Sequence, residues 1–259
     1  MRFRKLAVAA SLVSATSLAM LAGGAGAAFA VANGEPAKEG QYGFAAKIAA
    51  FDIPLPDGTT HDSGCSGALI SSQWIMTAGH CFHDINGHRT SGKVPFKTNA
   101  TVGRTDDADK TGDVVDIVED YQSPINDIAL AKLARPVRDV QPLALSHSAP
   151  KADEVLRIAG WGSLSDVNPT PATHLQTGQF TVTAVSATVV NLKGFKPQAT
   201  TSACLLDSGA PYFVEPANSA PQLVSVESDG PACPDTGPET TSRVDTVALW
   251  ASLTMLLHH

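Results

Sequence analysis

Positive charge is scarce in this sequence, which has 18 Lys and Arg residues against 25 Asp and Glu and a net charge of −7 at pH 7. Such an acidic protein repels phosphate backbones, so we expect no nucleic-acid partner. Long apolar runs are missing after residue 30, and we expect no membrane-spanning segment there. None of the four cysteines belongs to a C-x-x-C pair, which argues against a zinc site, and we expect neither a metal nor a cofactor.

The first thirty residues have the composition of a secretory signal peptide. Arg2, Arg4 and Lys5 precede an apolar stretch, and small residues follow up to Ala28-Phe29-Ala30, an A-x-A cleavage pattern. A membrane anchor is the alternative, but about 17 apolar residues fall short of the roughly 20 that span a bilayer. We therefore expect a secreted, extracellular protein that begins at Val31 and has no membrane contact after cleavage. Losing three cations lowers the net charge from −7 to −10.

The 229 residues that follow suit one large all-β domain or two small packed ones. Short β-rich runs broken by turn residues recur along them, for example 67–76 and 179–190, and predict an all-β sandwich or barrel. The segment 244–257 lacks Gly and Pro and places apolar residues near one face, which predicts a terminal helix. The segment 135–150, with three prolines, is the best candidate for a connection between two β halves.

Three short motifs carry residue types suited to nucleophilic catalysis. His80, in the string TAGHC, follows the apolar run 68–76, although a histidine at a strand end is more often structural. Asp127, in NDIAL, stands against an apolar run, where a carboxylate needs a hydrogen-bonded or charged partner; a strand-initiating turn aspartate is the plainer alternative. Ser208, in DSGAP, lies in a glycine-containing loop beside a second acid, and a Ser-Gly turn alone is usually just a turn.

Taken together, TAGHC, DIAL, DSG-x-P and the segment Gly160-Trp161-Gly162 resemble the trypsin/chymotrypsin family of serine proteases in chain order and approximate spacing. The chain looks like a secreted bacterial-type member, and the resemblance covers residues 31–257. It implies an all-β fold of two packed six-stranded antiparallel β-barrels with a C-terminal helix. Residues 31–140 are expected to form the barrel that carries His80 and Asp127. Residues 141–259 are expected to form the barrel that carries Ser208 and ends in the helix.

The resemblance also implies a role for each motif. Ser208 is expected to be the nucleophile and His80 the base that activates it and then protonates the leaving group. Asp127 is expected to be the buried carboxylate that fixes the imidazole tautomer and stabilises the imidazolium. Cleavage after residue 30 exposes Val31, whose new amine is expected to insert and pair with Asp207. The alternative is that Val31 is merely the remnant of signal cleavage.

The four cysteines of an exported chain predict two disulfides, because the export route is oxidising, but spacing alone allows three pairings. The resemblance implies Cys65 with Cys81, beside the histidine, and Cys204 with Cys233, beside the nucleophile loop. Each bridge is expected to tether a catalytic loop and to contribute on the order of 3 kcal/mol in the chain-entropy model.

Two departures from the family pattern lie next to the nucleophile and the cleft. Leu206 replaces a glycine whose N–H forms the oxyanion hole together with that of Ser208, and losing such a donor costs about 100- to 1000-fold in rate. Ser228-Asp229-Gly230 replaces a Ser-Trp-Gly segment, which leaves the pairing of substrate along that strand open. Ser228 is retained, and we expect it to contact Asp127.

The substrate pocket is located by counting from two cysteines. Two residues before Cys204 stands Ser202, expected at the base, where trypsin-like members carry an aspartate. Six residues after Cys233 stands Glu239, where a glycine usually leaves the pocket open. Either Glu239 supplies the charge for an Arg or Lys side chain, or it plugs the pocket. Ser228 and Gly230 complete the expected lining.

These motifs favour a secreted serine endopeptidase, a monomer that hydrolyses protein or peptide substrates through an acyl-enzyme. An esterase or lipase with the same triad is the first alternative, because esters are more reactive than amides and tolerate a damaged oxyanion hole. A binding protein is the second, with the cleft blocked by Leu206, Asp229 and Glu239. Assays on casein and on a short-chain nitrophenyl ester separate the three.

Overall fold

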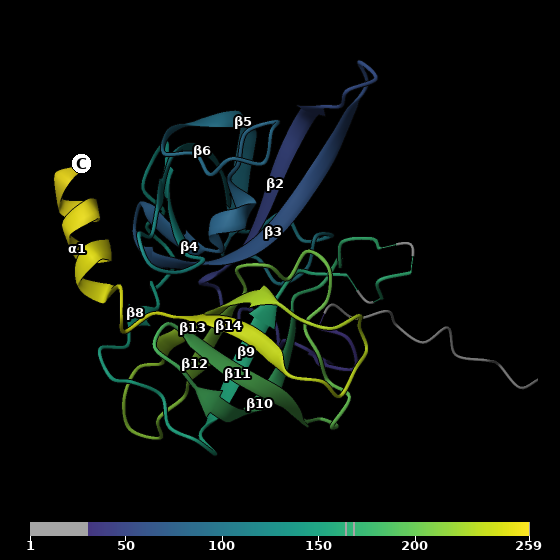
Figure 1. The fold of residues 1–259 in the computed structure, drawn as a ribbon, viewed down its shortest axis with the longest axis vertical. Helices are drawn as coiled ribbons and strands as arrows, with labels where there is room; N and C mark the ends of the chain where they lie inside the picture. The colour runs from purple at the N-terminus through teal and green to yellow at the C-terminus, as the bar shows by residue number, and fades with distance from the viewer. Residues whose placement is uncertain (1–30, 164, 168, 259) are drawn as a thin grey trace, which may run out of the picture.

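The computed structural model describes residues 31–163, 165–167 and 169–258. The predicted signal peptide, residues 1–30, lies outside the described residues. Figure 1 shows two β-barrels packed on each other and a helix at the C-terminal end, so the predicted fold class is confirmed. In the described part of the chain, no helix has the length and apolar character needed to cross a membrane.

The first barrel is closed and antiparallel, with the strand order β2-β3-β4-β7-β6-β5. Its strands are β2 (Ala45–Pro54), β3 (Thr60–Ser71), β4 (Trp74–Thr77), β5 (Gly92–Val102), β6 (Asp113–Gln122) and β7 (Ala129–Leu133). The distal parts of β2 and β3 form a long hairpin that projects from the barrel in Figure 1.

The second barrel has the order β9-β10-β11-β14-β13-β12 and closes where β12 pairs with β9. Its strands are β9 (Val155–Gly160), β10 (Gln176–Val185), β11 (Val189–Lys196), β12 (Pro211–Val214), β13 (Gln222–Asp229) and β14 (Glu239–Arg243). A short strand β8 (Ala144–Leu145) pairs with β13 in parallel. It lies in the connection between the barrels, which runs from the end of β7 to the start of β9.

Alternating burial explains why segments of mixed polarity form these strands. In β5, Thr98, Ala100 and Val102 are buried in the barrel, and the intervening Asn99 and Thr101 are only partly buried. Successive side chains of a strand point to opposite faces, so β5 contributes one face to the core while its other face can carry polar residues. The second barrel has its own core, in which the rings of Phe180 and Tyr212 meet edge to face at 5.2 Å.

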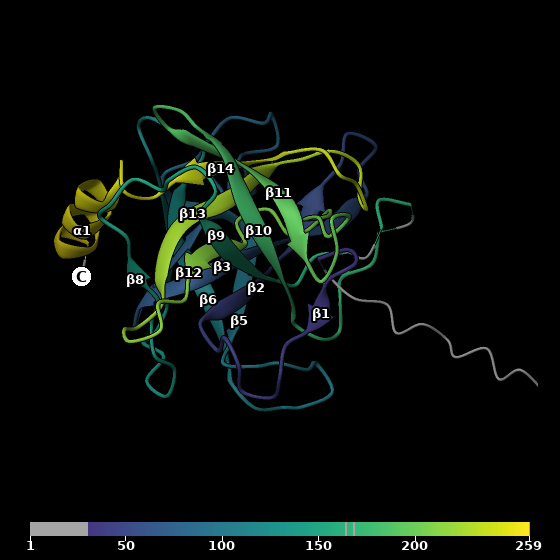
Figure 2. The same cartoon turned by 90° about the horizontal axis from the view of Figure 1, so that it is seen from below.

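Each end of the described chain packs on the barrel formed by the other half. Near the beginning, Val31 is fully buried in the core of the second barrel, and β1 (Glu35–Pro36) pairs with β10. At the other end, α1 (Ala248–Leu257) leaves the second barrel and packs on the first, where Tyr121 and His258 are hydrogen-bonded at 2.9 Å. Figure 2 shows β1 and α1 on opposite sides of the molecule. The two barrels are thus held together at both ends.

Candidate active site

His80 lies at the junction of the two barrels, in the short 3-10 helix η1 (Gly79–Cys81) that follows β4. All four residues of β4 are buried, so the strand fixes the position from which the histidine emerges. The disulfide between Cys65 and Cys81 ties the next residue to β3, as the resemblance implied. The imidazole itself is almost half exposed, with 45% of its side-chain surface accessible.

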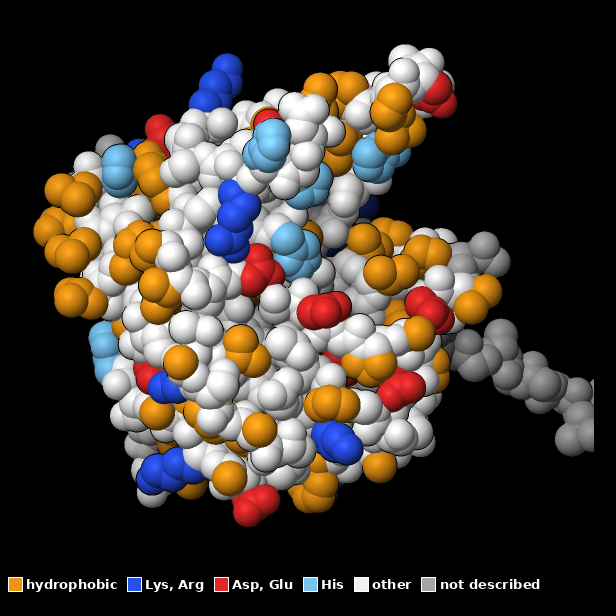
Figure 3. Space-filling view, in the orientation of Figure 1, with side chains coloured by type: hydrophobic (Ala, Val, Ile, Leu, Met, Phe, Trp, Pro, Cys, Tyr) orange, Lys and Arg blue, Asp and Glu red, His pale blue; other side chains and the backbone are white. Residues whose placement is uncertain are grey.

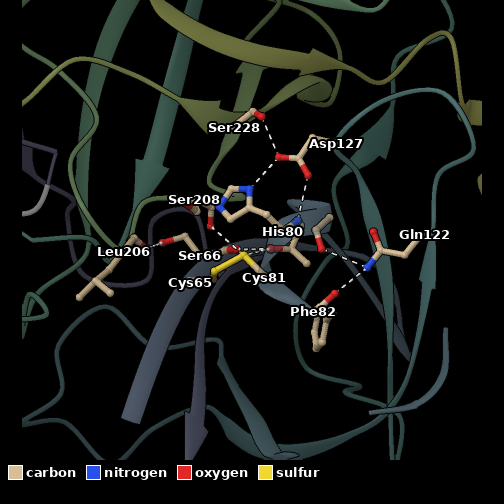
Figure 4. The surroundings of a disulfide bond; sticks show 12 residues. Cys65, Ser66, His80, Cys81, Phe82, Gln122, Asp127, Leu206, Ser208 and Ser228 are labelled. Carbon is tan, nitrogen blue, oxygen red and sulfur yellow. Dashed lines mark hydrogen bonds and ion pairs between the residues drawn. A yellow bond between two sulfur atoms is a disulfide. The ribbon is translucent and has the colours of Figure 1, made fainter. Parts of the chain in front are cut away.

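Asp127 precedes β7 and directs its carboxylate at His80. Its Oδ2 atom lies 2.7 Å from His80 Nδ1 and accepts a second hydrogen bond from the Ser228 hydroxyl at 2.7 Å, so the expected contact with Ser228 is confirmed. Its Oδ1 atom accepts the His80 backbone N–H at 2.9 Å (Figure 4). Burial alone raises the pKa of Asp127, but the hydrogen bonds from His80 and Ser228 hold it at about 2. The carboxylate is therefore ionised at neutral pH.

Ser208 lies beside the His80 ring in Figure 4, in the loop between Cys204 and β12. Its carbonyl oxygen accepts the backbone N–H of Ser66 from β3 at 2.8 Å, which anchors the loop on the first barrel. The next residue, Gly209, has φ +83°, and a side chain there would collide with Ser66 O and Thr77 Oγ1. Glycine at this position allows the loop to approach the first barrel closely enough to reach His80.

Leu206 has a positive φ of 75°, a conformation that favours glycine. Within the described residues, the N–H groups of Leu206 and Ser208 donate to no protein acceptor. Two such unpaired donors near a serine hydroxyl are suited to bind an oxygen on which negative charge develops. The carbonyl of Leu206 accepts the Ser66 hydroxyl at 3.2 Å, which helps to hold the loop in this conformation.

Asp207 is fully buried between the loop that carries Ser208 and the segment after β9. Its carboxylate accepts the N–H of Gly162 at 2.8 Å and that of Cys204 at 3.1 Å. Burial raises the pKa of Asp207 to about 7, although these bonds and one from the Val31 N–H act in the opposite direction. The nitrogen of Val31 thus already lies at the carboxylate with which its amine was expected to pair.

A cleft with a volume of about 660 Å³ runs past His80 and Ser208 into the second barrel. Figure 3 shows histidine and acidic side chains gathered on the surface between the barrels, with a basic side chain beside them. Ser228, Gly230 and Glu239 line the cleft as expected. The residues that line it are His80, Asp166, Ala203, Cys204, Leu205, Ser208, Glu227, Ser228, Asp229, Gly230, Pro231, Ala232, Cys233 and Glu239.

Ser202 lies behind this lining and not at the pocket base, which corrects the expectation from the sequence. It is buried, its N–H donates to Ala32 O at 3.0 Å, and its hydroxyl accepts the N–H of Asp235 at 3.3 Å. The next residue, Ala203, faces the cleft instead, because neighbouring side chains of an extended segment point to opposite sides. Ser202 therefore supports the pocket from outside. The disulfide between Cys204 and Cys233 closes this side of the cleft, as implied.

Two buried carboxyl groups stand at the inner end of the cleft. Glu239 Oε1 accepts the Ala203 N–H at 2.9 Å, whereas its Oε2, next to Gly230, has no hydrogen-bond partner among the described residues. Burial, followed by the charges of Asp207 and other acids, raises the pKa of Glu239 to about 8. Glu227 accepts the Tyr212 hydroxyl at 2.8 Å, and burial raises its pKa well above the usual range.

A family model described as Trypsin matches residues 31–251. The chain belongs to the trypsin family. Among curated relatives of this trypsin-family chain, snake venom serine protease KN14 of Trimeresurus stejnegeri is 35% identical over 122 residues, 45% of each chain. The thrombin-like enzyme elegaxobin-2 of Protobothrops elegans is 36% identical over 112 residues, 41% of this chain and 46% of the relative. A β-fibrinogenase-like protein of Daboia siamensis is 28% identical over 169 residues, 58% of this chain and 62% of the relative.

The trypsin-family chain spans about half the length of the curated relatives it matches. These relatives come from snakes, so the bacterial-type membership expected from the sequence is not supported. The family is the one that the four motifs indicated, and the correction concerns only the branch.

Sequence reasoning missed two charged residues of the site. Glu227 directly precedes Ser228 in β13, and an acid at an otherwise apolar strand position, as in Ser-Val-Glu-Ser, is the signal that could have identified it. Arg89 lies in the polar loop after His80, yet its guanidinium reaches Asp127 Oδ1 at 3.1 Å. Nothing in the sequence around Arg89 indicates that contact, because it depends on the path of the loop.

Proposed function

We propose that this chain is a secreted serine endopeptidase that hydrolyses peptide bonds through an acyl-enzyme, with Ser208, His80 and Asp127 as its triad. The observation that carries the proposal is the arrangement of an ionised Asp127 on one side of the His80 imidazole and Ser208 on the other (Figure 4). A carboxylate at Nδ1 keeps the proton on that nitrogen and leaves Nε2 free to act as a base.

In the first half of the reaction, Ser208 Oγ attacks the substrate carbonyl carbon while His80 removes the proton of the Ser208 hydroxyl. A C–O bond forms, and the carbonyl oxygen takes up the negative charge near the N–H groups of Leu206 and Ser208. His80 then gives its proton to the amine as the C–N bond breaks, which leaves the acyl group on Ser208.

In the second half, water takes the place of the amine. The water oxygen attacks the acyl carbon while His80 accepts a proton from the water. The C–O bond to Ser208 then breaks, His80 returns the proton to Ser208 Oγ, and the acid product leaves. Asp127 stays ionised throughout and stabilises the imidazolium in both halves.

The cleft supports a preference for Arg or Lys before the scissile bond. Its lining holds four acidic residues, Asp166, Glu227, Asp229 and Glu239, and, among the described residues, no Lys or Arg. Glu239 Oε2 is buried without a partner, which is costly unless a substrate donor reaches it. A cationic side chain would supply that donor in a charge-assisted hydrogen bond. The names of two relatives, a thrombin-like enzyme and a β-fibrinogenase-like protein, support a protein substrate.

The amino terminus supports activation by signal cleavage. The nitrogen of Val31 lies at Asp207 while it is still part of a peptide bond, and the Val31 side chain is already buried. Cleavage after residue 30 would convert that nitrogen to an ammonium group at the same place. A buried carboxylate gains more from a charged partner than from an amide, so the free terminus would stabilise the nucleophile loop.

Replacement of the nucleophile tests the proposal. Ser208→Ala is expected to abolish hydrolysis of casein and to leave the thermal unfolding temperature nearly unchanged, because Ser208 contributes to the transition state and little to the core. Ser219→Ala, which removes an exposed hydroxyl from the turn between β12 and β13, is the matched control and should retain full activity. Casein hydrolysis that survives in Ser208→Ala would refute the triad. Activity on a short-chain nitrophenyl ester, with none on casein, would instead favour an esterase.

A further inference from the structure

A tight hairpin presents Arg89 to the catalytic carboxylate. Residues 82–90 leave η1 and return, with His83 and Arg89 paired across the hairpin and the Thr90 N–H donating to Phe82 O. Asp84 organises the turn, because its Oδ1 atom accepts the N–H groups of Asn86 and His88. The hairpin therefore has a defined shape, and Arg89 stands at its end.

The guanidinium of Arg89 makes two contacts at the triad. Its Nη2 donates to Asp127 Oδ1 at 3.1 Å and to the carbonyl oxygen of Asn126 at 3.2 Å. Asp127 thereby receives four hydrogen bonds, two on each oxygen, from the His80 backbone, the His80 ring, Ser228 and Arg89. In the described part of the chain, Arg89 and His80 are the only basic residues within ion-pair distance of this carboxylate.

The space for this contact exists because residue 79 is a glycine. A Cβ atom at Gly79 would overlap Arg89 Nη2 and would lie 2.6 Å from Gln122 Oε1 and 2.9 Å from Asp127 Oδ1. Gly79 has no positive φ that would require glycine, so the close approach of these groups explains why a side chain is absent here.

We propose that Arg89 is a positioning residue of the triad, admitted to Asp127 Oδ1 by the missing side chain of Gly79, and that its charge makes His80 a weaker base. The proposal rests on the proposed function. A fixed cation on the far side of Asp127 disfavours a second positive charge on the imidazole. Removing that cation should therefore make the imidazolium easier to form, at the expense of the base form that attack on the substrate needs.

Other titratable groups surround the pair and set the background for this effect. His83, Asp84 and His88 belong to the same hairpin, and Asp120 of β6 accepts the hydroxyl of the neighbouring Thr90 at 3.1 Å. Asp229 of β13 lines the cleft together with His80. None of these acids forms an ion pair with Arg89 among the described residues, whereas Asp127 does.

The test is the pH profile of kcat/KM, whose acidic limb reports His80 in the free enzyme. Arg89→Gln should move that limb to higher pH by about 0.5 unit, the order of magnitude expected for two unit charges on either side of one carboxylate in a water-like dielectric. The water-like value is appropriate because 45% of the Arg89 side chain is exposed. Rates are normalised by titration of Ser208 with an active-site reagent, so that unfolded protein does not contribute.

Three further variants separate positioning from a merely structural role. Arg89→Lys keeps the charge and should leave the limb close to its original position. Lys93→Gln removes a charge that makes no ion pair among the described residues and should not move it. Gly79→Ala should reproduce the shift of Arg89→Gln by displacing the guanidinium, and should add no further shift in the Arg89→Gln background.

The proposal is overturned if Arg89→Gln leaves the acidic limb within about 0.1 unit of its original position, or if Lys93→Gln moves it equally. The role given to Gly79 would be overturned if Gly79→Ala shifts the acidic limb as much in the Arg89→Gln background as it does alone. Arg89→Lys and Gly79→Ala keep the test decisive even if Arg89→Gln fails to fold. Loss of all activity in Ser208→Ala is the independent check on the proposed function, and it does not depend on Arg89.

Discussion

Leu206 offers the sharpest test of how a local backbone conformation controls the rate of this site. Its φ of 75° is left-handed, and a residue with a Cβ atom pays about 1–2 kcal/mol for that conformation. Glycine adopts it freely. We therefore expect Leu206→Gly to raise kcat, because the conformation that leaves the N–H of residue 206 unpaired becomes easier to hold.

The strain sets the size of the effect. A cost of about 1–2 kcal/mol corresponds to a factor of roughly 5 to 30 in the population of a conformer, so the gain in kcat should fall within that range. The Michaelis constant should change little, because an oxyanion donor acts mainly when charge has developed on the substrate oxygen. The expected gain is smaller than the 100- to 1000-fold typical of losing a donor outright, since Leu206 already has the required sign of φ.

Two neighbouring variants identify the cause. Leu206→Ala retains Cβ and hence the strain but removes the side chain that packs near Gly64, and it should give little gain. Leu205→Gly changes the adjacent exposed residue, which has no positive φ, and should give none. The assay is kcat on a peptide nitroanilide, normalised by active-site titration. An unchanged kcat in Leu206→Gly would refute the strain argument, and a full gain in Leu206→Ala would assign the effect to side-chain bulk instead.

Adding one residue before Val31 in the processed protein should reduce turnover sharply, because the longer terminus cannot reach buried Asp207; unchanged turnover would make Val31 a cleavage remnant. Glu239→Gly should shift a peptide-library profile from Arg or Lys toward large apolar residues, and a basic preference that survives would remove Glu239 from that role. Folded Glu239 holds its proton up to about pH 8 and the unfolded chain releases it near 4.5, so the native state loses stability as pH rises through that window. Glu239→Gln has no such loss, so its melting temperature relative to that of the unmodified protein should rise from pH 4.5 to 8. A difference in melting temperature that stays constant over this range would contradict the raised pKa.

The sequence predicted the barrels well where apolar runs alternate with turns, and poorly where turns or cores are polar. The run 67–76 reads as one strand but is two, β3 and β4, because the turn between Ser71 and Trp74 contains neither Gly nor Pro. Strand β14 falls in the polar stretch 229–242, which reads as a loop. The hydroxyl of its inward residue Thr241 donates to Val190 O at 3.1 Å and accepts a hydrogen bond from the Ser225 hydroxyl at 2.8 Å, so hydrogen bonds replace apolar packing there.

The motifs of the site were predictable because each residue lies in a short string whose chemistry is local. The environment of those residues was not, since it depends on loops that are distant in sequence. Counting from cysteines assigned Glu239 to the pocket, and Glu239 does line the cleft, but it assigned Ser202 in place of Ala203, a one-residue error that inverts the direction of a side chain in an extended segment. Arg89 could not be assigned to Asp127 without knowing the course of its hairpin.

Ser66 explains how two barrels with separate cores hold Ser208 and His80 in register. It lies fully buried on β3, one residue after the half-cystine that is bonded to Cys81. Its N–H donates to Ser208 O, its hydroxyl donates to Leu206 O at 3.2 Å, and the same hydroxyl accepts the N–H of Trp161 at 3.0 Å. One side chain and its backbone therefore join the first barrel to both segments that surround Asp207. Because buried polar groups are costly to leave unpaired, any sliding of the barrels would break these bonds together, and that cost stabilises the placement of Ser208 beside His80.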